Sequence, residues 1–139
     1  MTDETNVKGR CLCGSVQVTV INIQKNIGAC HCNMCRTWGG GPFMAVECGT
    51  DVSFEGAEHL SVYNSSKWAD RGFCSQCGTH LFYRIKETQQ YFMPGGLFAD
   101  VHFNFEHQVF IDEKPDYYAF DNETEDMTGA ETFAKYGAS

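Results

Sequence analysis

Three cysteines fall within six positions in the stretch Ala29-Cys30-His31-Cys32-Asn33-Met34-Cys35-Arg36. Thiolates packed this densely in sequence are typical of a zinc site. In an extended segment the ring of His31 points away from the face that Cys30 and Cys32 share. We therefore predict that Cys30, Cys32 and Cys35 hold one zinc ion. Three is the number of ligands that a catalytic zinc takes from its protein.

Two cysteine pairs remain, Cys11 with Cys13 and Cys74 with Cys77. The second pair lies in a Cys-x-x-Cys-Gly turn, the usual zinc knuckle, in which Gly78 is expected to adopt the left-handed conformation. Pair plus pair supplies the four ligands of a closed structural zinc. Such a site ties together segments about sixty residues apart and would stabilise a small domain.

The eighth cysteine, Cys48, leaves an alternative open. It can in principle act as the fourth ligand of the zinc held by the three-cysteine motif. A lone cysteine at the end of a strand is more often a small buried hydrophobic residue, which is the interpretation we favour.

The whole chain has the size and composition of one domain: 139 residues, of which 42% are hydrophobic and 14% aromatic. Many Phe, Tyr, Val and Thr residues favour strands, and the predicted fold class is all-β, with mostly antiparallel sheets pinned by zinc sites. Strands are expected at 16–20, 27–29, 43–48, 52–54, 59–63, 81–85, 90–93 and 107–112. Residues 37–42 are expected to form a loop beside the triplet.

The composition changes at Asp121, after which Asp, Glu and Thr dominate. We predict a zinc-binding domain over residues 1–120 and a loosely held acidic tail over 121–139. Residues 130–136 can form a short helix with Phe133 packed inward, given tertiary support.

The formal charge of −8 disfavours nucleic acid as a partner, because an extended phosphate backbone would be repelled. The sequence contains no run of 18 apolar residues, so it predicts no membrane segment. The polar start of the chain does not resemble a secretory signal. A cytoplasmic, reducing location follows as the expectation. In that compartment cysteines are more often metal ligands than disulfides.

Three cations flank the cysteine motifs of this acidic chain, and they are the candidates for holding substrate carboxylates: Arg36, Lys67 and Arg71. His31 is expected to support the site from outside the ligand set, with a role as the proton-transferring base as the alternative. Three anionic sulfurs weaken zinc as a Lewis acid, so activation of water is disfavoured. A fourth soft sulfur completes the set readily, which predicts a thiol substrate.

Three motifs together resemble a known family, and they are Gly9-x-Cys11-x-Cys13-Gly14, Cys30-His31-Cys32-x-x-Cys35-Arg36 and Arg71-x-Phe73-Cys74-x-x-Cys77-Gly78. They resemble the glutathione-dependent formaldehyde-activating enzyme and centromere protein V family, and His107–Tyr118 is similar to its closing segment. The resemblance covers residues 8–120. It implies an Mss4-like all-β fold with two zinc ions, partitioned among the cysteines as above. The activity that it implies is formation of S-hydroxymethylglutathione from formaldehyde and glutathione, classed with carbon-sulfur lyases.

Three functional hypotheses follow. The leading one is a zinc-dependent carbon-sulfur lyase that acts on an adduct of glutathione, or a related thiol, with a small aldehyde. The alternative is a non-catalytic, zinc-stabilised protein-binding module that uses the Trp38 loop or the acidic tail. A redox switch through the triplet is less favoured, because bound zinc masks thiolates.

Overall fold

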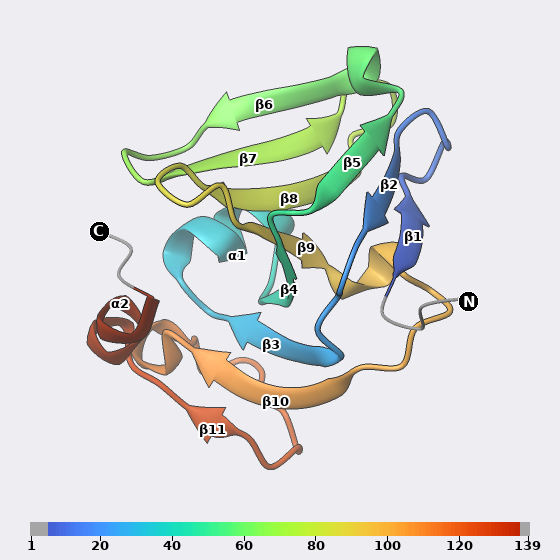
Figure 1. Cartoon of the computed structure of the whole chain (residues 1–139). Coiled ribbons are helices and arrows are strands. Elements are labelled where there is room, and N and C mark those ends of the chain that lie inside the picture. The colour runs from blue at the N-terminus through green and yellow to red at the C-terminus, as the bar shows by residue number, and fades with distance from the viewer. Residues whose placement is uncertain (1–5, 137–139) are drawn as a thin grey trace.

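Strands dominate residues 6–136, the part of the chain that the computed structural model describes (Figure 1). The strands are β1 (Val7–Arg10), β2 (Gln17–Val20), β3 (Asn26–Cys30), β4 (Phe43–Gly49), β5 (Val52–Glu55), β6 (Leu60–Asn64), β7 (Ala69–Cys74), β8 (His80–Ile85), β9 (Tyr91–Pro94), β10 (Asn104–Val109) and β11 (Glu125–Asp126). The helices are α1 (Asn33–Gly39) and α2 (Gly129–Tyr136), with 3₁₀ turns at Ala57–His59, Gly95–Leu97 and Ile111–Glu113. The predicted all-β class is confirmed.

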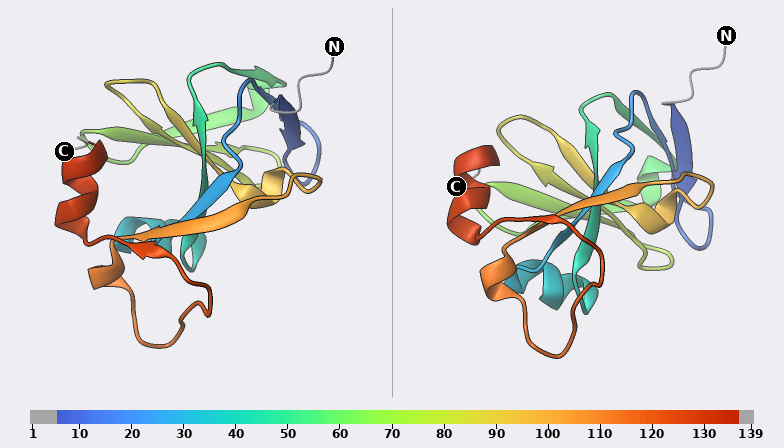
Figure 2. Two further views of the ribbon diagram at one scale, coloured as in Figure 1. Left: turned by 60° about the horizontal axis from the view of Figure 1, so that its bottom comes forward. Right: turned by 90° about the horizontal axis from the view of Figure 1, so that it is seen from below.

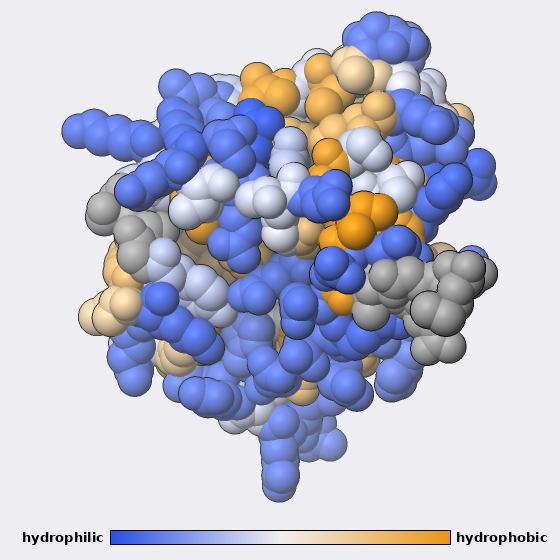
Figure 3. Space-filling model, in the orientation of Figure 1, coloured by the Kyte–Doolittle hydropathy of each residue, from blue (hydrophilic) through white to orange (hydrophobic). Residues whose placement is uncertain are grey.

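The strands form two sheets. The smaller has the order β1-β2-β5, and both of its pairings are antiparallel. The larger has the order β11-β10-β3-β4-β9-β8-β7-β6 and is antiparallel except at β10, which pairs in parallel with β3 and with β11. The face in Figure 3 is mostly hydrophilic, and its hydrophobic residues gather towards β5, at the upper right.

One hydrophobic core joins the two sheets. Val16, directly before β2, and Val18 and Val20 within it are almost fully buried, as the period of two predicts. The larger sheet contributes Val46 and Met93, among others, to the same cluster. Cys11 and Cys74 belong to it too, so one cysteine of each pair in the predicted four-cysteine site is part of the core.

The two faces of β4 have different surroundings. Val46 and Cys48 point into the core, while Phe43, Ala45 and Glu47 line a cavity on the other side of the larger sheet. This is the alternation expected of a strand, whose successive side chains lie on opposite faces. Cys48 is 1% exposed and donates its thiol to the Val46 carbonyl oxygen at 3.4 Å.

Helix α1 extends to Gly39 and so replaces the first half of the loop expected over residues 37–42; that part of the prediction is wrong. The Cys32 side chain caps the start of the helix, and Gly40, at φ 86°, ends it by donating its N–H to the Arg36 carbonyl oxygen. Trp38 lies in this helix and stacks on His80 at 3.9 Å between ring centroids. The sequence signal was weak because a thiol is an unusual cap and the helix has only seven residues.

The segment after Asp121 carries regular structure. Strand β11 pairs with β10, and α2 packs through Phe133 on Trp68 and Phe110, at ring-centroid distances of 6.2 and 5.4 Å. The Asp112 carboxylate accepts the Gly129 N–H at 2.8 Å and fixes the first turn of α2. Helix α2 and strand β1 lie at opposite ends of the molecule in every view (Figures 1 and 2). Within residues 6–136 no helix is long and apolar enough to span a membrane.

Candidate metal centres and the adjoining cavity

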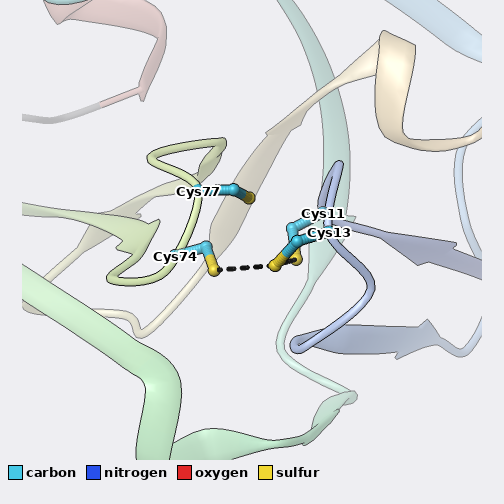
Figure 4. A group of neighbouring side chains, drawn as sticks. All are labelled: Cys11, Cys13, Cys74 and Cys77. Atoms are coloured by element: carbon cyan, nitrogen blue, oxygen red, sulfur yellow. Dashed lines mark hydrogen bonds between the residues drawn. The ribbon is translucent and has the colours of Figure 1, made fainter.

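The first cysteine cluster brings together two segments far apart in the chain. Figure 4 shows Cys11 and Cys13, from the turn after β1, facing Cys74, which ends β7, and Cys77, from the turn that follows. All four sulfurs lie within 4.8 Å of one another. The Cys13 sulfur is 3.6 Å from that of Cys11 and 3.8 Å from that of Cys74. Sulfurs bound to one tetrahedral zinc by bonds of about 2.3 Å are about 3.8 Å apart, so this donor set fits the ion.

The turn that carries Cys74 and Cys77 has the geometry of a zinc knuckle. Gly78 has φ 78° and donates its N–H to the Cys74 carbonyl oxygen at 2.8 Å, as the left-handed expectation requires. The Gln76 N–H points at the Cys74 sulfur at 3.4 Å. Backbone donors of this kind stabilise a thiolate without adding a charged side chain.

The second cluster is local in sequence. Cys30 ends β3, Cys32 caps α1 and Cys35 lies in the first turn of that helix, so the strand-to-helix junction gathers the three sulfurs. They lie within 4.8 Å of one another, and the Cys35 N–H points at the Cys32 sulfur at 3.4 Å. Three sulfurs at this spacing fit a zinc ion that takes three ligands from the protein.

Hydrogen bonds among the three thiols of this cluster give them different pKa values. Those from Cys30 and Cys35 lower the pKa of Cys32 well below its ordinary value, while the hydrogen bond with Cys32 raises the pKa of Cys30 far above it. The first negative charge of the cluster therefore falls on Cys32. A bound cation would displace the remaining protons.

Arg71 reaches the second cluster from β7. It is 3% exposed, and its Nη2 points at the Cys35 sulfur at 3.5 Å. Its guanidinium carbon lies 4.9 Å from the ring centroid of Trp38 and 5.0 Å from that of Tyr83. Its Nε and Nη1 are buried without a hydrogen-bond partner within residues 6–136. Two unpaired donors on a buried cation indicate a place for an oxygen-bearing ligand.

A cavity of about 300 Å³ adjoins Arg71 and the three cysteines of the second cluster. Most of its wall is apolar, with side chains from the larger sheet, from the residue after β10 and from α2: Phe43, Ala45, Ile85, Phe92, Val109, Phe110 and Phe133. The remaining polar lining includes Glu47, Tyr83, His107, Glu113 and Tyr136. An apolar pocket with a few placed polar groups has the general form of a small-molecule site.

The other predicted site residues are not part of the cavity lining. His31 is fully buried, and its two ring nitrogens pair with the Tyr118 hydroxyl at 2.8 Å and with the Gln108 side-chain oxygen at 2.7 Å. Burial lowers the pKa of His31. Arg36 donates its Nε to the His31 carbonyl oxygen at 2.9 Å, and Lys67 is exposed. Of the four side chains predicted for catalysis or substrate binding, the structure brings Arg71 to the cavity.

Sequence reasoning missed the acidic groups of the cavity. Glu113 lines it and accepts the Asn33 N–H at 2.9 Å, directly beside Cys32 in the chain. Glu47 faces Tyr136, and burial together with that carboxylate raises the pKa of Tyr136 to about 12. The period of two along β4 could have placed Glu47 opposite the core, but no local pattern indicates that Glu113 returns to residue 33 from 80 positions away.

The family is established by the comparisons with known proteins. A profile of the glutathione-dependent formaldehyde-activating enzyme family matches residues 6–113, and the chain belongs to that family. An uncharacterised lyase of Schizosaccharomyces pombe is 37% identical over 123 residues, which are 87% of this chain and 90% of the relative. A Halomonas elongata protein, whose name provisionally assigns it glutathione-dependent formaldehyde activation, is 31% identical over 85 residues, covering 55% of this chain and 54% of its own.

A solved structure supports the fold. The crystal structure of a Rhodobacter sphaeroides protein superposes with a TM-score of 0.59 at 24% identity, covering 69% of this chain and 91% of that one. The predicted family resemblance is thus confirmed by the profile, and the fold by this neighbour.

Proposed function

We propose that this protein is a zinc-dependent enzyme of the carbon-sulfur lyase type, which makes or breaks the bond between the sulfur of glutathione, or a related thiol, and an aldehyde carbon. The observation that carries the proposal is the cluster of Cys30, Cys32 and Cys35 at the wall of a cavity that also holds the unpaired donors of Arg71. The family and the names of the relatives support a glutathione-linked aldehyde activity.

The two clusters would hold one zinc ion each, with different roles. The four cysteines of the first, Cys11, Cys13, Cys74 and Cys77, make up a complete tetrahedral set. Cys30, Cys32 and Cys35 provide one ligand fewer, and zinc held there supplies a position that accepts and deprotonates a thiol. Cys48 does not supply the missing ligand, because it lies on the core side of β4.

Arg71 is the side chain placed to hold an oxygen of the adduct. Its Nε and Nη1 are free to donate to a carboxylate, or to the oxygen that carries negative charge as the carbon-sulfur bond breaks or forms. Stacking on Trp38 and Tyr83 fixes the guanidinium plane. A preorganised donor in a site with little water is a strong source of electrostatic stabilisation.

Glu113 is our candidate for the proton transfer in place of His31. Its carboxylate lies at the cavity and is anchored at the residue after Cys32, whereas both nitrogens of the His31 ring are already paired. In the direction of synthesis, the sulfur adds to the carbonyl carbon, the carbon-oxygen π bond breaks, and the oxygen takes up one proton. The thiol loses one proton as the oxygen gains one, so no other reactant is needed.

The test is exchange NMR, because thiohemiacetals also form spontaneously. Zinc-loaded protein is added to an equilibrated mixture of glutathione and formaldehyde, and the exchange rate between free glutathione and the adduct is measured. We expect exchange well above the spontaneous rate for the wild type, and loss of the acceleration in Cys32→Ser and Glu113→Gln.

Cys48→Ala serves as the matched control, because it removes a thiol outside both clusters. It should retain two zinc ions and the acceleration. Equal exchange rates with and without the wild-type protein would contradict the enzyme and favour the alternative, a zinc-stabilised binding module.

A further inference from the structure

The cavity is much larger than formaldehyde needs. A water molecule occupies about 30 Å³ in the liquid, and formaldehyde is only slightly larger, whereas the cavity measures about 300 Å³. Its volume is at the lower end of the range for pockets that hold drug-sized molecules. The apolar wall and the carboxylates of Glu47 and Glu113 do not suit the charged backbone of glutathione, so with formaldehyde as the aldehyde most of this space would be left to water.

The register of the sheet gives the cavity a direction. Phe43 is paired with Cys30, so this end of β4 lies next to the second cluster. Ala45 and Glu47 follow on the same face of the strand, and Glu47 is about 13 Å from Phe43 along the strand. The apolar lining therefore extends from the metal ligands to the Glu47 end.

The middle of this path is left open by a small side chain. Ala45 is paired with Gly28 of β3 and with Pro94 of β9. Gly28 allows the His107 ring to pack against its backbone, because a Cβ there would lie 2.2 Å from the His107 Nε2. A larger residue at position 45 would project into the cavity between its two ends.

Helix α2 closes the opposite side with aromatic rings. Phe133 contacts Trp68 and Phe110, and the ring of Tyr136 lies 6.3 Å from that of Phe92. An apolar or aromatic group next to the metal ligands would thus be enclosed between the sheet and α2. Each methylene buried there strengthens binding about fourfold.

We propose that the cavity holds the carbon skeleton of an aldehyde substrate with an apolar or aromatic group, of about six to ten non-hydrogen atoms, and not formaldehyde alone. This proposal rests on the proposed function. The reacting carbon lies beside Cys30, Cys32 and Cys35, its oxygen meets Arg71, and the group attached to the carbon extends over Ala45 towards Glu47.

The experiment measures thiol binding rather than turnover, so it separates this proposal from the proposed function. Cobalt replaces zinc, and the cobalt absorption is titrated with benzyl mercaptan and with ethanethiol. Benzyl mercaptan places a phenyl group one carbon from the sulfur, where the aldehyde's group lies in the adduct. We expect it to bind at least tenfold more tightly than ethanethiol.

Cavity-filling variants supply the decisive comparison. Ala45→Leu in β4 and Val109→Phe in β10 should each reduce the preference for benzyl mercaptan at least fivefold. Ala57→Leu makes the same chemical change as Ala45→Leu at an exposed position far from the cavity, and should keep the preference. Thermal unfolding and metal content identify any variant that has lost its fold.

Each outcome of these titrations supports or overturns the proposal of a larger aldehyde. Equal affinities for the two thiols, or equal losses of both in the folded variants, would overturn the proposal. The preference for benzyl mercaptan, with its loss in the cavity variants, would support it even if the exchange experiment with formaldehyde showed no acceleration. Acceleration with formaldehyde but no preference would leave the enzyme and remove the larger aldehyde.

Discussion

The two cysteine clusters gather similar potential ligands from differently arranged segments of the chain. Cys11, Cys13, Cys74 and Cys77 come from two turns more than sixty positions apart, and two of the four sulfurs lie within the hydrophobic core. The other cluster comes from a single strand-to-helix junction and lies at a cavity. A metal bound to the first cluster would therefore close a long loop of chain, whereas a metal bound to the second would close only a very short one.

This difference determines what each metal can contribute. Fixing two distant segments removes chain entropy from the unfolded state, so a metal bound by the four cysteines would contribute to the stability of the whole domain. Three ligands within six positions give little such stabilisation, and the site lacks one protein ligand. Under the proposed function, the local cluster is thus the one that would bind the substrate sulfur.

The largest expected effect is the loss of folding in Cys74→Ser. Because the apparent binding free energy of a structural zinc is about 10 kcal/mol or more, and a domain is stable by about 5–15 kcal/mol, removing one ligand should abolish the cooperative thermal transition. Cys32→Ser should keep that transition, bind half as much zinc and lose thiol binding. Circular dichroism with a metal assay measures both, and equal loss of fold in the two variants would contradict the division.

Partial chelation should separate the clusters in the wild-type protein. The three-cysteine cluster offers fewer ligands and adjoins a cavity, so a competing chelator should remove its zinc first. We expect thiol binding to disappear after one equivalent of zinc is lost, with the unfolding temperature nearly unchanged. Zinc release followed by a colorimetric indicator checks the order, and simultaneous loss of both ions would count against it.

Arg71→Met should reduce activity without reducing stability. A buried cation with two unpaired donors is costly, and a hydrophobic residue of similar length can replace it at little or no loss of stability. The exchange rate should fall roughly 10²-fold, the usual effect of removing a donor that stabilises developing charge. Arg71→Lys controls for charge alone. A large drop in thermal stability with unchanged exchange would show that Arg71 has a structural role.

His31→Gln should have the smallest effect and mainly on stability. Losing the paired contacts with Tyr118 and Gln108 should cost about 1–3 kcal/mol, while exchange stays within about threefold. Burial lowers the pKa of His31 in the folded state, so below about pH 6.5 the unfolded wild type binds the extra proton. The stability difference between wild type and variant should therefore shrink as the pH falls from 7. Loss of exchange without destabilisation would restore His31 as the base.

The cysteine spacing predicted the clusters well, because metal-ligand geometry is local within each motif and four ligands are required for a closed site. The structure gathers the two groups as predicted, and the burial of Val16, Val18 and Val20 follows from the period of two. Helix α1 was missed because it is short and is capped by the thiol of Cys32.

The cavity could not be predicted, because it is formed by long-range pairing. Glu113 reaches Asn33 across 80 positions, and Phe133 reaches Trp68 from a segment whose acidic composition suggested a loose tail. Of the three cations near the motifs, local sequence gave no reason to select Arg71. Its burial between Trp38 and Tyr83 depends on the pairing of β7 with β8 and on the position of α1.

The most direct test of the central comparison is cadmium-113 NMR of protein with both sites loaded with cadmium. Two resonances are expected, one from the four-sulfur site and one from the three-sulfur site, and Cys32→Ser should alter only the second. Adding glutathione should move the second resonance towards the position of the first and leave the first unchanged. If both resonances stay in place with glutathione, or if both have four-sulfur positions before it is added, the account of one closed and one open site is contradicted.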